Sequence, residues 1–582
     1  MKYIIAFIFL CLGTIGYANI AAKKGIIQAR QPDGTVISIR MIGDARNKTI
    51  HSADGYLLTT DEAGYYVFAN KDAKGMPVPS GVHYQNPEHR SPADNNIIKV
   101  FDTNGLDISY APVEESRNVP GTKGPGLGKS KFPGIGNHRA VVILVEFSDI
   151  DFTIENPHDF YTRLLNEEGF SDYGATGSVR DYFVSNSCGK FQPQFDVYGP
   201  VKLDKPHYYY GMNSPLGGGD MNPYDMVVEA CELLDNEIDF SQYDCNEDGF
   251  IDNIYFYYAG YGEADGGGAN TIWPHSWDIT KVSWYPFRFD GVRLDHYACS
   301  NELKFENDEP DGIGTFCHEF CHVLGFPDLY PTGYSSAFTP YSWNILDMGN
   351  YNNDSHTPAN MSAYERYALD WLEPELLTGG EKTLVNLADS NHAFLVKTEN
   401  DDEYFLLENR QQKGFDEYLP GHGMLVWHID FIAQKWDNNT VNNIAYHQCV
   451  DLIEADDVQT RETDDGDPFP GAMNVTEFSP STSPAFISWN NTPLPFCIYD
   501  IRESEEGVVT FSVDAADAGV EKINNKLGVL IIGNEVILQS TDVRVYNLAG
   551  YVMKRQKSDR LILPKGVYMA RDSKNSIKFV IE

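Results

Sequence analysis

The chain has 582 residues, which is too long for a single hydrophobic core and predicts about three to five domains. Hydrophobic residues make up 42% of it and aromatic residues 13%, which favours folded, largely β-rich domains over disorder. A formal net charge of −40 argues against nucleic acid or an anionic membrane as a partner, because binding to phosphates requires a basic surface.

The N-terminus has the composition of a signal peptide, predicted over residues 1–18. A lysine precedes an apolar run of about a dozen residues, and Gly16 and Ala18 are small, as signal peptidase requires. This run is short for a bilayer span and no later segment approaches that length, so we expect no integral membrane span after signal removal. Export places the eight remaining cysteines where disulfides can form, although their spacing does not determine the pairing.

Residues 19–117 consist of short alternating runs separated by Pro-Asp-Gly, Ala-Asp-Gly and Glu-Ala-Gly turns, and they predict a small β-rich domain. Residues 118–137 are rich in Gly, Pro and Lys, which is typical of an exposed linker open to proteolysis. Lys123, Lys129 and Lys131 are its candidate cleavage sites.

The next predicted domain covers residues 138–373 and mixes strands with helices. Its strands are expected at 139–149, 253–264 and 296–303, and its first helices at 157–167, 178–187 and 225–236. His275, in a glycine-rich loop, is either a cleft residue or a hydrogen-bonded core histidine.

An acidic loop in this domain matches most of a calcium-binding loop. Oxygen-bearing side chains fill loop positions 1, 3, 5 and 9, and glycine fills position 6, but position 12 is Tyr255 where a bidentate carboxylate belongs. A plain acidic turn is the alternative. The candidate calcium ligands are Asp244, Asn246, Asp248 and Asp252.

Residues 312–330, GIGTFCHEFCHVLGFPDLY, contain the H-E-x-x-H pattern of a zinc-dependent hydrolase. His318 and His322 are four residues apart, so on a helix both imidazoles can reach one metal while Glu319 points toward a water molecule. We expect the helix to begin near Asp311, whose carboxylate would cap it, and its apolar stripe to face the core. Cys317 and Cys321 are interpreted as packed thiols rather than ligands.

The residues after the helix supply a candidate third ligand. Gly325 permits a sharp turn, Pro327 stops the helix, and the turn brings Asp328 back toward the metal. Two imidazoles and one carboxylate leave a position for water on zinc, and Glu319 would act as general base in peptide-bond hydrolysis. Glu365, on a later predicted helix, is the competing third ligand.

The same residues resemble the immune inhibitor A-like zinc metallopeptidases, a secreted bacterial family related to the metzincins. The resemblance rests on HEFCHVLGFPDLY with IGT before it and SWNILDMGNY after it, and on SVRDYFVSNSCGKF, YAGYGEA, IWPH, SAYERYALDWLEP, EYFLLENRQ and LPGHGMLVWHID. It covers about residues 25–515 in the same order. It implies His318, His322 and Asp328 as zinc ligands and Glu319 as the base.

One position departs from that family. A methionine usually lies in the turn below the zinc, whereas the matching position after Trp343 is Leu346, with Met348 two residues later. Leucine conserves volume and apolarity, so we expect the hydrophobic floor under the metal to persist.

Two further β domains are predicted after the catalytic one. Residues 374–516 have the strand spacing of a β-sandwich, in which we expect His422 and His428 to be structural. The aspartates between 456 and 467 are interpreted as a solvated loop, with a calcium site as the alternative. Between 521 and 582 the charge balance reverses to 11 basic against 6 acidic residues. Residues 517–582 resemble the sorting domains of the type IX secretion system, which implies contact with outer-membrane secretion machinery of a Gram-negative bacterium.

The fold class predicted is therefore α+β and multidomain, with a mixed-sheet, zincin-like catalytic domain built around an active-site helix. The function predicted is a secreted or surface-attached zinc endopeptidase acting on proteins or peptides, with residues 19–117 as a propeptide and calcium as a further cofactor. A cell-surface binding protein on a catalytically vestigial peptidase scaffold is the alternative.

Overall fold

A computed structural model describes two stretches of the chain. The first is residues 21–515 except 24, 45–47, 73–76, 102–125, 129, 215–218, 284, 334 and 336. The second is residues 529–581 except 533–534, 539–542, 548–550, 554–559 and 572–575. The predicted signal peptide and the first part of the predicted linker lie outside these residues. No helix among the described residues combines the length and apolarity needed to cross a membrane.

The N-terminal region forms an antiparallel sheet in which each strand pairs with the next one in sequence. Its elements are β1 (Ile27–Arg30), β2 (Val36–Ile42), β3 (Thr49–Ser52), β4 (Leu57–Thr60), β5 (Tyr66–Lys71), β6 (Pro77–His83) and α1 (Pro92–Ile97). Alternate residues of β2 face inward, with Ile37, Ile39 and Met41 buried. The three predicted turn sequences all lie between strands of this sheet.

The N-terminal sheet shares its core with the domain that follows. Ala264, Ala269 and Trp273 pack in the same apolar cluster as the inward residues of β1 to β5. The ammonium group of Lys48 pairs with the buried carboxylate of Glu263. Removing this sheet would therefore expose apolar surface on its neighbour.

The second region is built on a five-stranded sheet of order β10-β13-β9-β7-β8, parallel except for β10. The strands are β7 (Arg139–Glu146), β8 (Gln194–Lys202), β9 (Ile254–Tyr261), β10 (His275–Asp278) and β13 (His296–Leu303). Around them lie α2 (Pro157–Asn166), α3 (Val179–Asn186), α4 (His207–Gly211), α5 (Pro223–Leu234), and the short pair β11 (Arg288–Phe289) and β12 (Val292–Arg293). Val142 and Leu144 of β7 face one core and Val141, Ile143 and Val145 face another, which explains the continuous apolar run of this strand.

Helix α6 (Gly314–Val323) carries the predicted metal-binding motif, and α7 (Ala363–Ala368) follows it. The apolar stripe predicted for α6 is fully buried. The predicted start at Asp311 is wrong, because no side chain caps the helix and the preceding residue is Ile313. Gly312 and Gly314 leave no room for a Cβ against the backbone of Asn350 and Ser355, so the chain entering the helix needs glycine at these two positions.

Two sheets follow α7 and enclose a core of their own. The first contains β14 (Glu375–Leu376), β16 (Phe394–Lys397), β17 (Glu403–Arg410), β18 (Gly423–Asp430) and β19 (Val450–Leu452), and the second β15 (Gly380–Leu384), β20 (Phe496–Glu503) and β21 (Val509–Ala515). The helices α8 (Leu387–Ser390) and α9 (Ala433–Asp437) lie in their connections. Phe405 and Val426 face the core between these sheets, as expected for a sandwich.

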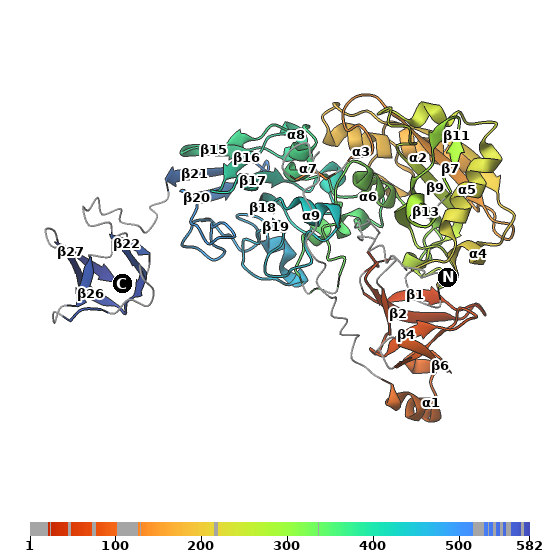
Figure 1. The fold of residues 1–582 in the computed structure, drawn as a ribbon, viewed down its shortest axis with the longest axis horizontal. Coiled ribbons are helices and arrows are strands. Elements are labelled where there is room, and N and C mark those ends of the chain that lie inside the picture. Colours follow the sequence, from red (N-terminus) through yellow and green to blue (C-terminus); the bar gives the residue numbers. More distant parts are fainter. Residues whose placement is uncertain are drawn as a thin grey trace, which may run out of the picture.

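The opposite face of β17 and β18 belongs to the core that surrounds α6. Leu406 and Trp427 pack in the same cluster as Phe316 and Phe320 of the helix. Figure 1 shows α6 between the five-stranded sheet and the sheet of β16, β17 and β18. The apolar core therefore continues across residue 373, where the sequence predicts a domain boundary.

The C-terminal region contains two three-stranded antiparallel sheets. Its strands are β22 (Val529–Ile532), β23 (Glu535–Leu538), β24 (Arg544–Asn547), β25 (Arg560–Ile562), β26 (Gly566–Arg571) and β27 (Ser576–Ile581). Val536, Val545 and Leu561 belong to a core cluster that contains only residues of this region among those described.

Candidate metal centre

Helix α6 presents two histidines on one face. The side chains of His318 and His322 are 0% and 5% exposed. His318 Nδ1 lies 2.8 Å from the carbonyl oxygen of Ile345, and His322 Nδ1 lies 2.9 Å from that of Phe326. Because a carbonyl only accepts, each Nδ1 carries the proton, and each Nε2 keeps a lone pair that can bind a metal.

The turn after the helix brings the predicted carboxylate to these nitrogens. Gly325 has φ of +108°, and its N–H donates to the carbonyl oxygen of His322 at 3.0 Å. Asp328 Oδ1 then lies 3.1 Å from His318 Nε2 and 3.3 Å from His322 Nε2. The three donor atoms all lie within 4.8 Å of one another, so the chain brings together the three residues that the sequence proposed as ligands.

The charges at this site suit a cation. Burial would raise the pKa of Asp328, but the two imidazoles hold it below the usual range of a carboxyl. Burial lowers the pKa of His322, which favours the neutral imidazole. An ionised carboxylate and neutral imidazoles are the forms in which these side chains bind zinc.

Glu319 is fully buried beside the three donors. Neither of its carboxylate oxygens has a hydrogen-bond partner among the described residues. Burial, and then the negative charge of Asp328, raise the pKa of Glu319 well above its usual value. A divalent cation held by the neighbouring residues would act in the opposite direction and favour the ionised form.

This donor set fits a zinc ion. Two nitrogens and one oxygen leave a fourth tetrahedral position, as in zinc sites that perform catalysis. Cys317 and Cys321 are both fully buried in the apolar core, and burial raises the pKa of both thiols well above its usual value. They pack in the apolar core, as the sequence predicted, and lie outside the group of three converging donors.

The segment after Trp343 lies under this centre and holds it in place. Besides accepting from His318, it binds the Asp328 loop, since the Leu329 N–H donates to the carbonyl oxygen of Leu346 at 2.8 Å. Leu346 is fully buried in the core that surrounds α6. Met348 is 6% exposed and packs instead with Tyr330 and Ala21.

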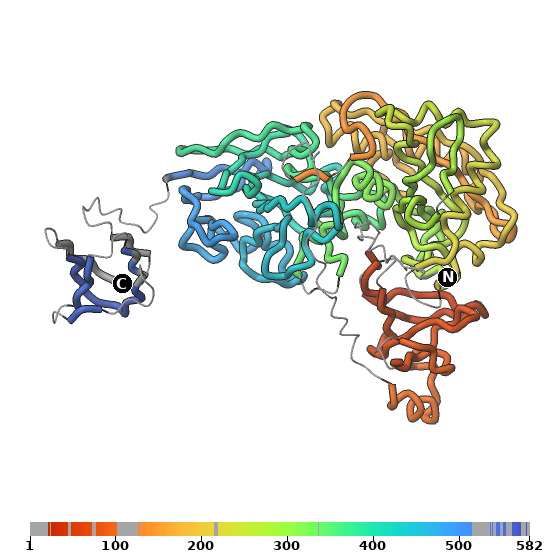
Figure 2. The backbone as a smooth tube through the Cα atoms, in the orientation of Figure 1, coloured from red at the N-terminus to blue at the C-terminus, as the bar shows by residue number. Residues whose placement is uncertain are grey.

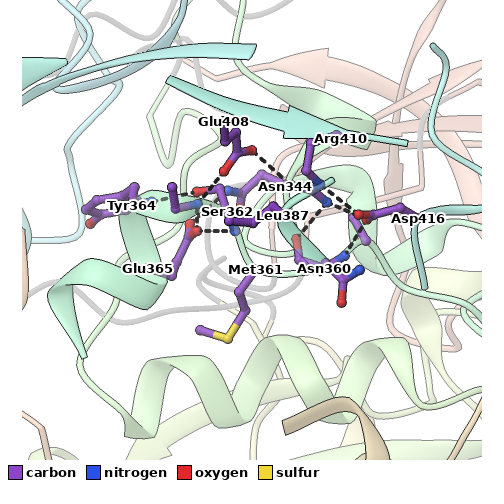
Figure 3. Close-up of polar contacts among 12 residues, drawn as sticks. Asn344, Asn360, Met361, Ser362, Tyr364, Glu365, Leu387, Glu408, Arg410 and Asp416 are labelled. Carbon is purple, nitrogen blue, oxygen red and sulfur yellow. Dashed lines mark hydrogen bonds and ion pairs between the residues drawn. The ribbon is translucent and has the colours of Figure 1, made fainter. Parts of the chain in front are cut away.

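Glu365 has a role that differs from metal binding. Its Oε1 accepts from Asn344 Nδ2 at 2.8 Å, and its Oε2 accepts from the Ser362 N–H at 2.7 Å and from the Ser362 hydroxyl. Figure 3 shows Glu365 turned toward these two residues. Both oxygens are therefore used to cap α7 and to hold Asn344, whose own Oδ1 accepts from the Leu346 N–H at 2.8 Å.

A buried network of charges supports α7 from the side of β17 (Figure 3). Arg410 donates to Asp416 through Nε at 2.7 Å and to the carbonyl oxygen of Asn360 at 3.0 Å. Asp416 accepts from the Asn360 N–H at 2.9 Å, and Glu408 accepts from the Ala363 N–H. The carboxylates around Arg410 balance its charge in the interior, so the network fixes the chain that leads into α7.

The acidic loop at 244–252 also gathers its carboxylates. One oxygen from each of Asp244, Asp248 and Asp252 lies within 4.8 Å of the others. Asp252 is 3% exposed, and its Oδ1 has no hydrogen-bond partner among the described residues. Burial, and then Asp248 and Asp244, raise the pKa of Asp252 to about 7. The fourth predicted ligand, Asn246, accepts from the Asp248 N–H at 2.9 Å.

The acidic stretch between 456 and 467 was predicted to be a solvated loop, and this is wrong for two of its residues. Asp464 is 6% exposed and Asp467 is 1% exposed. Asp467 Oδ2 accepts from Trp343 Nε1 at 2.9 Å. A partner more than 100 residues away therefore draws this carboxylate into the interior.

Three histidines considered from the sequence have structural partners. His275 is a core residue, with Nδ1 2.6 Å from the carbonyl oxygen of Trp273 and Nε2 2.8 Å from the Tyr297 hydroxyl. His428 Nε2 lies 2.8 Å from Glu403, and His422 Nδ1 lies 2.8 Å from a Glu503 oxygen.

The sequence did not predict the roles of Asn344 and Asn439. Asn344 binds the Leu346 N–H in the segment under the metal centre, and Asn439 binds Asp328. Asn439 contacts both the backbone and the carboxylate of Asp328. The only local signal is the density of asparagine in residues 438–443, and such density is equally common in ordinary loops.

Comparison with known proteins finds that part of the chain is similar to a described family. Residues 134–380 match the model for the immune inhibitor A peptidase M6 catalytic domain. A pre-pro-metalloprotease, PrtV, of Vibrio cholerae serotype O1 is 28% identical over 274 residues, which cover 39% of this chain and 29% of the relative. Immune inhibitor A of Bacillus thuringiensis subsp. alesti is 24% identical over 286 residues, which cover 42% and 41%. The matches thus span less than half of these curated relatives.

Proposed function

We propose that this chain is a secreted, zinc-dependent endopeptidase with its catalytic domain around the M6-matched residues 134–380. One observation carries the proposal: His318, His322 and Asp328 converge within 4.8 Å, beside the buried and unpartnered carboxylate of Glu319. The names of the two relatives, a metalloprotease and immune inhibitor A, support the same class of activity.

The residues have distinct roles in the proposed reaction. His318, His322 and Asp328 would hold zinc, which when bound polarises the substrate carbonyl and acidifies a water molecule. Glu319 accepts the proton of that water through a carboxylate oxygen and passes it to the leaving amine. The hydrogen bonds from Nδ1 to Ile345 and Phe326 fix the orientation of the two imidazoles.

We propose that the N-terminal propeptide, residues 19–117, helps to keep this site closed. All four site side chains are at most 5% exposed, whereas a peptide substrate needs access to them. Ala21 packs with Tyr330 and Met348, and the Tyr351 hydroxyl donates to the Ala21 carbonyl oxygen at 2.9 Å. We therefore place activation in the linker, upstream of Leu127 and Phe132, which are buried in the core around α6.

Among the candidate cleavage sites, Lys123 and Lys129 lie outside the described residues. Lys131 is unsuited to cleavage, because its N–H donates to the carbonyl oxygen of Val323 at 2.9 Å and its ammonium pairs with Asp278. Figure 2 shows the short segment that follows residue 125 and contains Lys131 among later parts of the chain.

Hydrolysis of casein tests the proposal and the latency together. A recognition sequence for a site-specific protease replaces residues 119–124, and the chain is assayed before cleavage and after cleavage and removal of the N-terminal fragment. We expect activity only after cleavage, its loss with 1,10-phenanthroline, and its return with added zinc. Activity that resists the chelator would contradict a metallopeptidase, and equal activity before cleavage would contradict the propeptide.

We also propose that Asp244, Asp248 and Asp252 bind calcium. Three converging carboxylates suit a hard cation that prefers oxygen ligands. Calcium is expected to raise the melting temperature of the protein by ligand linkage, and Asp252→Asn should remove this shift while Asp235→Asn, on an exposed residue outside the loop, should keep it. A shift of the same size in both variants would place calcium elsewhere.

Residues 517–582 remain our proposal for a sorting domain that delivers the protein to the outer surface of a Gram-negative bacterium. Support comes from the reversed charge of this segment and from its own core cluster. Protein lacking this segment should accumulate in the periplasm, and its appearance outside the outer membrane would refute the assignment.

A further inference from the structure

We propose that Asn439 is a positioning residue of the metal centre, which fixes the carboxylate of Asp328 so that a single oxygen faces the two histidines. This inference rests on the proposed metallopeptidase function. It assigns a role in the centre to a residue that lies outside the M6-matched segment, which ends at residue 380.

The carboxamide of Asn439 contacts Asp328 twice. Its Oδ1 accepts from the Asp328 N–H at 2.7 Å, and its Nδ2 donates to Asp328 Oδ2 at 2.6 Å. Because a backbone N–H only donates, the first bond determines which end of the amide is oxygen and which is nitrogen. With Oδ2 engaged, Asp328 Oδ1 is the oxygen that lies 3.1 and 3.3 Å from the imidazole nitrogens.

The position of Asn439 is itself well defined. It follows α9, is 4% exposed and has φ of +53°, a left-handed conformation that asparagine adopts more readily than most residues. The hydroxyl of Thr332 donates to its carbonyl oxygen. The backbone of Asn439 is thus held in place, and its short side chain reaches Asp328 from that fixed position.

The neighbouring asparagines join the same two loops without touching the ligand carboxylate. Asn442 Nδ2 donates to the carbonyl oxygen of Leu329 at 2.8 Å, and Asn443 Oδ1 accepts from the Thr332 N–H at 2.8 Å. Asn442 and Asn443 therefore also hold these two loops together. Substituting either of them measures the effect of loop packing alone. Asn439 differs from both because its donor reaches a charged oxygen of the ligand.

A hydrogen bond to a buried carboxylate is both strong and directional. Losing it removes a bond that restrains Asp328 Oδ2 and with it the orientation in which Oδ1 faces the two imidazoles. Outer partners of metal ligands typically contribute about 10–100-fold to metal affinity. We therefore expect Asn439 to act on the strength and the geometry of metal binding.

Two substitutions test this role in the full chain. Asn439→Asp keeps the volume and an acceptor for the Asp328 N–H but replaces the donor, and Asn439→Gly removes the side chain while accepting the positive φ. Zinc affinity is measured by competition with a chromophoric chelator, and the visible spectrum of the cobalt(II)-loaded protein reports ligand geometry. Asn443→Asp is the matched control, and thermal melting of the metal-free forms monitors folding.

Both Asn439 variants should bind zinc about 10–100-fold more weakly and change the cobalt spectrum, whereas Asn443→Asp should match the wild type in both. Melting transitions of the metal-free variants close to that of the wild type would show that folding is retained. Wild-type affinity and an unchanged spectrum in both Asn439 variants would overturn this inference alone. Absence of zinc binding by the wild type would overturn the proposed function along with it.

Discussion

Replacing Glu319 with Gln is expected to lower kcat/KM for casein by about 10²–10⁴-fold while zinc remains bound at one equivalent. Glutamine conserves the shape of the side chain, so the buried site should keep its packing. It cannot accept a proton, however, and no other carboxylate among the described residues lies at this position beside the three ligands. Turnover and zinc content, measured on the same protein sample, check both parts of the expectation.

Glu403→Gln is the matched control for this substitution. Glu403 is equally removed from solvent, at 2% exposed, and accepts from His428 and from the Trp489 N–H at 2.7 Å. The same chemical change is therefore made at a buried carboxylate away from the metal centre, and activity should persist. Wild-type turnover in Glu319→Gln would exclude Glu319 as the general base.

Replacing Asp328 with Ala should abolish stoichiometric zinc binding. We expect zinc affinity to fall by more than about 100-fold, which is the upper end of the effect of losing a residue that only supports a metal ligand. The change removes one of three ligand atoms and leaves two imidazoles, which are insufficient for a stable catalytic site. Elemental analysis after dialysis against a weak chelator provides the measurement. Activity should fall with zinc content.

Glu365→Gln separates the two candidate third ligands. Because both oxygens of Glu365 already accept hydrogen bonds from Asn344 and Ser362, this variant should keep its zinc. Zinc retained in Asp328→Ala but lost in Glu365→Gln would reverse the assignment.

The parts of the site that depend on neighbouring residues in sequence were predictable. The spacing of His318 and His322 places both on one helix face, and Gly325 with Pro327 indicates the turn that brings Asp328 back. Each of these inferences uses a local periodicity or a backbone preference. The structure places all three side chains together, as those preferences imply.

The supports of the site were not predictable, because their partners are distant in sequence. Asn439 lies 111 residues from Asp328, and Trp343 lies 124 residues from Asp467. No local pattern distinguishes these residues from ordinary polar residues of a loop. The wrong helix start at Asp311 has a similar origin, since the chain entering the helix lies against Asn350 and Ser355, which are distant in sequence.

The fold, like the site, was predicted where it depends on local sequence. Alternation and turn residues located the strands of the N-terminal sheet, and the apolar run at 139–146 located a buried parallel strand. Composition suggested a boundary at residue 373, but it contains no information about the rear face of β17 and β18. That face belongs to the same apolar cluster as α6, so the core around the helix continues into residues far beyond it in sequence.

This continuous core limits which gene segments can be exchanged between related enzymes. A gene fragment ending at residue 380 would carry every proposed ligand but would cut through the core cluster that holds Phe316 and Phe320 together with Leu406 and Trp427. Recombination that exchanged only this fragment between enzymes would have to supply an equally matched partner sheet. The helix and the sheet that shares its core would therefore have to be exchanged together.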